Sequence, residues 1–200
     1  MRKDRVEELR SCLFPSIVIE DEMEMIKTID SIRESNITTI ALSAKSDMME
    51  KAIHSIHEEF PDLTLIASDV TMLMQCENVV RWGIGIIMTP GYNEDIVSWC
   101  LSNGIAVIPG CSTASDIMRC LNHEIKVVNL FPAELIGNVV LIEEFNEAFH
   151  DVCFIPSGGI GLQEIPKYLK CKNVYGICFD GIDIDNLMEE MKAIKDISFG

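Results

Sequence analysis

Short apolar runs alternate with longer amphipathic stretches along the whole chain, and this pattern constrains its fold more than any other feature. We count eight such units, without a repeat at the level of sequence. Strands separated by helix-length segments typically form a parallel sheet covered by helices. Two hundred residues with 48% apolar content suffice for one domain with a substantial core. The sequence therefore predicts a single α/β domain over residues 1–200.

The elements expected from hydrophobic periodicity are eight short strands with helices between them. The strands are expected at 15–19, 37–42, 63–67, 84–88, 105–108, 127–131, 152–155 and 174–178. The helices are expected at 6–13, 23–35, 47–60, 70–82, 94–103 and 183–194, with a further helix entered at Ser112 or Thr113 as N-cap. Asp47 is a plausible N-cap of its helix, and Gly104 is a plausible C-cap.

Charge and cysteine content limit the classes of partner. Thirty-two acidic against sixteen basic side chains give a formal charge of −16, which repels polyanions. We therefore expect neither nucleic acid nor an acidic membrane as partner. The N-terminus lacks the apolar segment of a signal peptide, and no apolar run is long enough to span a bilayer. Eight cysteines without a C-x-x-C pair are typical of reduced thiols, so we expect a cytoplasmic protein.

One strand ends in a motif that suggests where the chemistry lies. Residues 127–134 read Val-Val-Asn-Leu-Phe-Pro-Ala-Glu, in which Pro132 cannot donate to a sheet ladder and ends the strand. In a barrel of alternating strands and helices, the active site lies at the carboxyl ends of the strands. Asn129 is at such an end. Lys126, three residues earlier, has the opposite strand parity and should not reach the same space.

Three motifs in this order resemble the 2-keto-3-deoxy-6-phosphogluconate (KDPG) aldolase family. They are Ile-Pro-Gly-Cys-Ser-Thr at 108–113, Phe-Pro-Ala-Glu at 131–134 and Pro-Ser-Gly-Gly-Ile at 156–160. The resemblance covers nearly the whole chain. It implies a single (β/α)8 barrel, a homotrimer, a keto acid or related small molecule as ligand, and no cofactor. In the family, KDPG is cleaved to pyruvate and glyceraldehyde 3-phosphate.

Two catalytic positions differ from those that the resemblance implies. The family's Schiff-base lysine corresponds to Asn129, and its proton-handling glutamate corresponds to Ala41. An amide nitrogen cannot form an imine, because its lone pair is delocalised into the carbonyl group. Ser43 and Lys45 stand in place of a threonine and an arginine, and Lys45 is the only amine that we place near the mouth.

The resemblance also implies the remaining residues of a ligand pocket. They are Ser68, Asp69, Pro90, Glu134, Ser157, Gly158, Gly159 and Asp180. Asp69 is either an N-cap of the helix at 70–82 or an acidic pocket residue. Glu134 is either a motif residue or an acid that favours the helix dipole. Asp180 stands where the family has the serine of a phosphate cradle.

Three functions remain open from the sequence. The first is a carbon–carbon lyase that uses a relocated residue such as Lys45. The second is a binding or regulatory protein that keeps a small-molecule pocket without covalent catalysis. The third is a structural remnant whose partner is another protein. His54 and His57 lie at i and i+3 but lack further ligands, so we expect no metal site.

Overall fold

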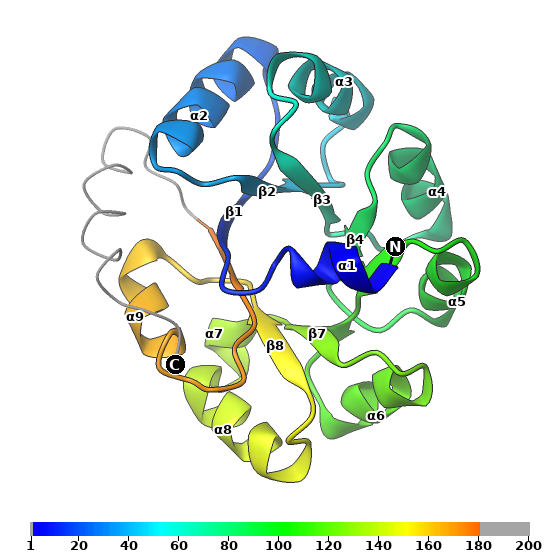
Figure 1. Cartoon of the computed structure of the whole chain (residues 1–200), viewed down its shortest axis with the longest axis vertical. Coiled ribbons are helices and arrows are strands. Elements are labelled where there is room, and N and C mark those ends of the chain that lie inside the picture. The colour runs from blue at the N-terminus through cyan, green and yellow to red at the C-terminus, as the bar shows by residue number, and fades with distance from the viewer. Residues whose placement is uncertain (1, 181–200) are drawn as a thin grey trace.

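The protein consists of parallel strands surrounded by helices (Figure 1), as seen in a computed structural model that describes residues 2–180. The strands are β1 (Leu13–Ile17), β2 (Thr39–Ser43), β3 (Thr64–Ser68), β4 (Ile86–Met88), β5 (Ala106–Ile108), β6 (Gly110–Cys111), β7 (Val127–Leu130), β8 (Cys153–Pro156) and β9 (Ile177–Phe179). The helices are α1 (Arg2–Glu7), α2 (Glu22–Glu34), α3 (Met49–Glu59), α4 (Leu73–Arg81), α5 (Glu94–Ser102), α6 (Ala114–Asn122), α7 (Ala133–Ile136), α8 (Asn138–Ala148), a 3₁₀ turn (Leu162–Glu164) and α9 (Ile165–Tyr168).

The strands form two parallel sheets that follow one another around a common interior. The first sheet has the order β5-β4-β3-β2-β1-β9, and the second has the order β6-β7-β8. Only Pro109 separates β5 from β6, and its carbonyl accepts the backbone N–H of Asn129 at 2.9 Å. Every strand pair is parallel, which confirms the predicted α/β class with a parallel, curled sheet.

Strand parity divides the core into an outer and an inner layer. In β3, Leu65 and Ala67 belong to the outer cluster, which lies between the strands and the helices, whereas Ile66 belongs to the inner cluster. The inner cluster is made by the side chains that face the common interior: Leu9, Phe14, Ala41, Ile66, Ile86, Met88, Ala106, Ile108, Ile155, Tyr175 and Cys178. Side chains of one parity share a face, so polar residues further along the same faces must meet at the carboxyl ends of the strands.

The N-terminal helix was predicted at 6–13 and instead ends at Glu7. The backbone N–H of Ser11 donates to the carbonyl of Tyr175 at 2.6 Å, so this segment already follows the strand side of the molecule. Strand β1 consequently starts at Leu13 and ends at Ile17, earlier than the predicted 15–19. Beyond it, Val18 is exposed, which is consistent with a chain that has left the sheet.

Two predicted helix caps are wrong. Helix α3 begins at Met49, and its N-cap Met48 donates its N–H to the hydroxyl of Ser46, so Asp47 does not cap it. Helix α4 begins at Leu73, three residues after the predicted start, and the side chain of Gln75 accepts the N–H groups before it. Asp69 is therefore free for a different role.

Other helix ends agree with the sequence. Thr113, one of the two candidate caps, accepts the N–H of Asp116, whose carboxylate accepts the N–H of Thr113 in return. Gly104 follows the end of α5 with φ +69°, a conformation that glycine adopts without steric cost. The predicted helix at 183–194 lies outside the described residues. Among residues 2–180, no helix has the length and apolar character needed to cross a membrane.

Candidate functional site

A cavity of about 210 Å³ lies at the carboxyl ends of the strands, which is where the inward faces become polar. Its lining consists of Ser16, Lys45, Ser68, Asp69, Met88, Pro90, Asn129, Phe131, Ser157, Gly158, Cys178 and Asp180. Eight of these twelve belong to the pocket expected from the sequence. The other expected residues, Ser43, Glu134 and Gly159, lie outside this lining. We refer to this cavity as the mouth cavity.

The lining residues that sequence reasoning missed are Ser16, Met88, Phe131 and Cys178. Ser16 lies two residues after inward-facing Phe14, and Met88 lies two residues after inward-facing Ile86. Strand parity predicts their direction once the strand bounds are known. The first strand was expected at 15–19 but lies at Leu13–Ile17, so its parity could not be used to place Ser16 from the sequence.

Asn129 has both ends of its amide group engaged. Its Nδ2 donates to the backbone carbonyl of Thr89 at 2.9 Å, and its Oδ1 accepts from the hydroxyl of Ser157 at 2.6 Å. A carbonyl can only accept, which fixes the orientation of the amide. The side chain is 2% exposed, so these bonds satisfy a buried polar group whose desolvation would otherwise be costly. Asn129 thereby links the ends of β4, β7 and β8.

Ala41 lies below the mouth cavity. It is fully buried in the inner cluster, and its strand partners in register are Ser16 and Ile66. A methyl group cannot accept or donate a proton. The position therefore contributes packing and no acid–base chemistry.

Asp69 faces the mouth cavity from a strained backbone. Its φ is +54°, which is uncommon outside glycine. Its Oδ2 accepts from the hydroxyl of Ser43 at 2.7 Å and lies 3.2 Å from Nζ of Lys45. These contacts hold the carboxylate over the end of β2. Of the two roles left open by the sequence, the cap is excluded by the late start of α4, and the residue lines the cavity.

Asp180 occupies part of the glycine turn that follows β8. Its Oδ2 accepts the backbone N–H of Gly159 at 2.8 Å. Burial raises the pKa of the Asp180 carboxyl, and the nearby Asp69 raises it further, whereas backbone hydrogen bonds from Gly159 and Ile160 oppose the rise. The turn thus already holds an anionic oxygen that belongs to the protein.

Glu134 is tied to the helical shell. Its two carboxylate oxygens accept from the hydroxyl of Tyr168 at 2.6 Å and from Nζ of Lys167 at 2.8 Å. Burial, followed by this hydrogen bond, raises the pKa of Tyr168, so its hydroxyl remains a donor. Glu134 thereby connects α7 to α9.

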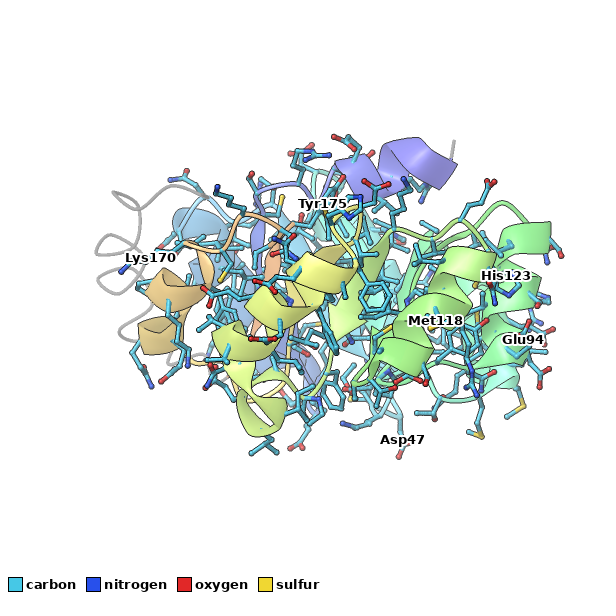
Figure 2. All side chains as sticks on the ribbon, turned by 90° about the horizontal axis from the view of Figure 1, so that it is seen from below. Asp47, Glu94, Met118, His123, Lys170 and Tyr175 are labelled. Atoms are coloured by element: carbon cyan, nitrogen blue, oxygen red, sulfur yellow. The ribbon has the colours of Figure 1, made fainter. Side chains whose placement is uncertain are left out.

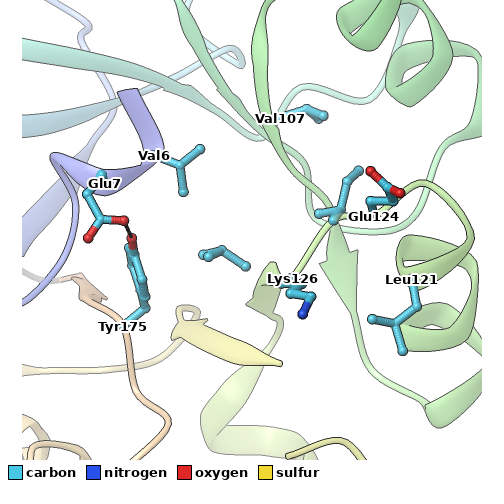
Figure 3. Close-up of a pocket in the computed structure, with 9 residues that line it drawn as sticks. Val6, Glu7, Val107, Leu121, Glu124, Lys126 and Tyr175 are labelled. Carbon is cyan, nitrogen blue, oxygen red and sulfur yellow. Dashed lines mark hydrogen bonds between the residues drawn. The ribbon is translucent and has the colours of Figure 1, made fainter. Parts of the chain in front are cut away.

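A second and larger cavity of about 420 Å³ lies at the other end of the strands (Figure 3). It is lined by Val6, Glu7, Val107, Leu121, Glu124, Ile125, Lys126, Val127 and Tyr175. Figure 2 shows Tyr175 near one edge of the molecule and Asp47, which follows β2, at the opposite edge. Lys126 pairs with Asp151 at 3.0 Å, and the amine is therefore remote from Asn129, as strand parity indicated. Among residues 2–180, no group of three or more His, Cys, Asp or Glu side chains could hold a metal ion.

The curled parallel sheet, with a polar cavity at the carboxyl ends of its strands, defines a TIM-barrel-like α/β protein. The family described as KDPG and KHG aldolase matches residues 5–195, and the chain belongs to that family. The 2-dehydro-3-deoxy-phosphogluconate aldolase of Treponema pallidum is 28% identical over 157 residues, covering 78% of this chain and 75% of that protein. The corresponding aldolase of Pseudomonas aeruginosa is 27% identical over 169 residues, covering 84% of this chain and 76% of that protein.

Solved structures show the same fold. The KDPG aldolase of Zymomonas mobilis ZM4, determined with 3-phosphoglycerate, has a TM-score of 0.86 at 23% identity and covers 98% of this chain and 95% of that one. The KDPG aldolase of Legionella pneumophila, with pyruvate captured as a covalent carbinolamine, also has a TM-score of 0.86 at 23% identity, with 96% of each chain covered.

Proposed function

We propose that this protein is a diverged KDPG/KHG aldolase-family member that binds a small molecule non-covalently in the mouth cavity. The observation that carries the proposal is the environment of Asn129. The resemblance places the Schiff-base lysine there, and the amide at this position is buried and hydrogen-bonded at both ends, to Thr89 and to Ser157. Such a group is built into the framework and offers no nucleophile to a keto acid.

The proton-handling position supports the same proposal. Ala41 is fully buried among apolar side chains, with no water-accessible face from which a proton could be exchanged. A positioned acid–base group typically contributes about 10²- to 10⁴-fold to a rate. Restoring an amine alone would therefore leave carbon–carbon cleavage slow.

The alternative of a relocated lysine is weakened by the contacts of Lys45. Its Nζ pairs with the carboxylate of Asp69 at 3.2 Å, and its side chain is 68% exposed. A Schiff-base amine must be neutral to attack, and proteins achieve this by desolvation or by a neighbouring cation. Lys45 has neither feature among the contacts of the described residues.

For the framework, we infer closure of the strands into one (β/α)8 barrel. Three contacts support this: the junction of β5 and β6 at Pro109, the parallel bridge between Phe154 and Val174, and the pairing of β9 with β1. They lie at the two places where the edges of the two sheets adjoin, which is where a closed barrel requires contacts. The family resemblance supports a homotrimer, and the eight free thiols support a reducing, cytoplasmic location.

Turnover of KDPG tests the proposed function. The wild type should release no pyruvate above background, and neither should Asn129→Lys or Ala41→Glu alone. Activity, if it can be restored, should require Asn129→Lys combined with Ala41→Glu. Asp62→Asn, which changes an exposed carboxylate remote from the cavity, is the matched control. Pyruvate release by the wild type at a rate typical of enzymes would contradict the proposal.

A further inference from the structure

The mouth cavity carries more negative than positive charge. Among residues 2–180, two carboxylates, Asp69 and Asp180, and one ammonium group, Lys45, line it. Lys45 is already paired with Asp69 at 3.2 Å. Within the described part of the chain, the donors to Asp180 are backbone N–H groups of the glycine turn, and Lys45 acts on it more weakly than Asp69 does. The unbalanced charge in the cavity is therefore that of Asp180.

Ser68 provides a separate indication that a ligand belongs here. It shares the parity of inward-facing Ile66, lines the cavity and is 3% exposed. Its hydroxyl has no hydrogen-bond partner among the described residues. Buried hydroxyls without a partner are rare, because an unmade hydrogen bond costs the desolvation of the group. A polar group of a ligand would satisfy it.

We propose that the mouth cavity takes a small ligand bearing an ammonium group, with Asp180 and Asp69 as counter-charges and Ser68 as a hydrogen-bond acceptor. This inference rests on the proposed function, since it assumes non-covalent binding in the same cavity. An ammonium group supplies three donors and one positive charge. A keto acid would instead bring a carboxylate toward two carboxylates, of which only one is paired with a lysine.

The cavity volume limits the size of the ligand. About 210 Å³ is below the ~300–1,000 Å³ range of pockets for drug-sized molecules. Compounds of a few non-hydrogen atoms are therefore suitable probes. Ethanolamine, ethylene glycol and glycolate form a matched series, because each has two carbons with a hydroxyl at one end. The other end is an ammonium group, a second hydroxyl and a carboxylate, respectively, so the charge runs from +1 through 0 to −1 at pH 7.

Ligand-observed NMR titration of the full chain with these three probes tests the inference. Ethanolamine should bind with millimolar affinity and at least tenfold more tightly than ethylene glycol, and glycolate should bind most weakly. Asp180→Asn should weaken ethanolamine about tenfold, and Ser68→Ala should weaken it about threefold, the loss of one hydrogen bond. Lys45→Met should increase the affinity for ethanolamine, because it removes the competing cation. A misfolded variant could not show such an increase.

The control is Asp62→Asn, which lowers the net negative charge as much as Asp180→Asn does but at a side chain that is 86% exposed. It should leave ethanolamine binding unchanged. Equal affinity for the three probes, tighter binding of glycolate, or an equal loss in Asp62→Asn would overturn the inference. None of these outcomes bears on carbon–carbon cleavage, which the KDPG turnover experiment measures independently.

Discussion

At the scale of single residues, Asp180 changes what the glycine turn can bind. In many barrels the loops after the seventh and eighth strands bind phosphate through backbone N–H groups. Here the carboxylate of Asp180 already accepts the N–H of Gly159 at 2.8 Å. A phosphate would have to displace it and would also meet its charge. The Gly159 N–H in this turn is thus already occupied by a side chain of the protein.

Phosphate should consequently bind weakly, with millimolar or poorer affinity. Repulsion between unit charges near 4 Å is about 1 to 4 kcal/mol, depending on the surroundings, which can outweigh a few backbone hydrogen bonds. Asp180→Ser should increase the affinity for phosphate about tenfold or more, as measured by calorimetric titration. Asp62→Ser serves as the charge control. Micromolar binding of phosphate to the wild type would refute this prediction.

The sequence shows an asparagine, Asn129, at the position where the resemblance implies the catalytic lysine, but the contacts of this asparagine could not be predicted. The partners of Asn129, in contrast, are the Thr89 carbonyl and the Ser157 hydroxyl, which lie 40 and 28 positions away in the chain. The positive φ of Asp69 was also hidden, because aspartate before a helical stretch equally favours a cap.

At the scale of elements, Gly110 joins the two sheets. A Cβ at this position would lie 2.2 Å from the carbonyl carbon of Pro90 and 2.3 Å from the backbone nitrogen of Gly91. Its N–H also donates to the hydroxyl of Thr89 at 3.1 Å. The start of β6 therefore packs directly against the backbone that follows β4, where Pro90 lines the mouth cavity.

Gly110→Ala should destabilise the protein by about 1 to 3 kcal/mol or more, because backbone atoms must move to admit the methyl group. Gly91→Ala is the control, since a Cβ there meets nothing within 4 Å. It should change the free energy of unfolding by less than about 1 kcal/mol. Urea denaturation measures both. Equal midpoints for the two variants would show that the contact does not constrain the sheets.

The predicted strands correspond to strands of the structure in the same chain order, but their boundaries differ and the short strand β6 was not predicted. Periodicity located the buried runs of all eight units, because each run has to fill an inward and an outward layer. The ends depend on contacts from elsewhere in the chain. Ser11 donates to Tyr175, and Gln75 accepts N–H groups that Asp69 was expected to satisfy. Because such hydrogen-bond partners are brought together by the tertiary structure, they could not be identified from local sequence.

At the scale of the whole molecule, several large apolar side chains remain on the helical surface. Met74 is 63% exposed, Met118 is 58% exposed and Leu135 is 83% exposed. Single exposed apolar residues are normal, but an assembly would remove some of them from water. This observation is consistent with the homotrimer that the family resemblance supports.

Light scattering coupled to size exclusion should therefore give three times the 22.4 kDa chain mass. The ratio should persist on dilution into the low-micromolar range and in moderate salt, which screens repulsion between chains of net charge −16. A mass of one chain under all these conditions would contradict the trimer.

The central claim is that this aldolase-family chain has no Schiff-base amine in its mouth cavity. Incubating the wild type with pyruvate and borohydride, followed by intact mass spectrometry, tests it most directly, because reduction makes any imine permanent. We expect an unchanged mass for the wild type and a trapped adduct for Asn129→Lys, whose amine would be buried and hence more readily neutral. A pyruvate adduct on the wild type, mapped to the peptide that contains Lys45, would contradict it.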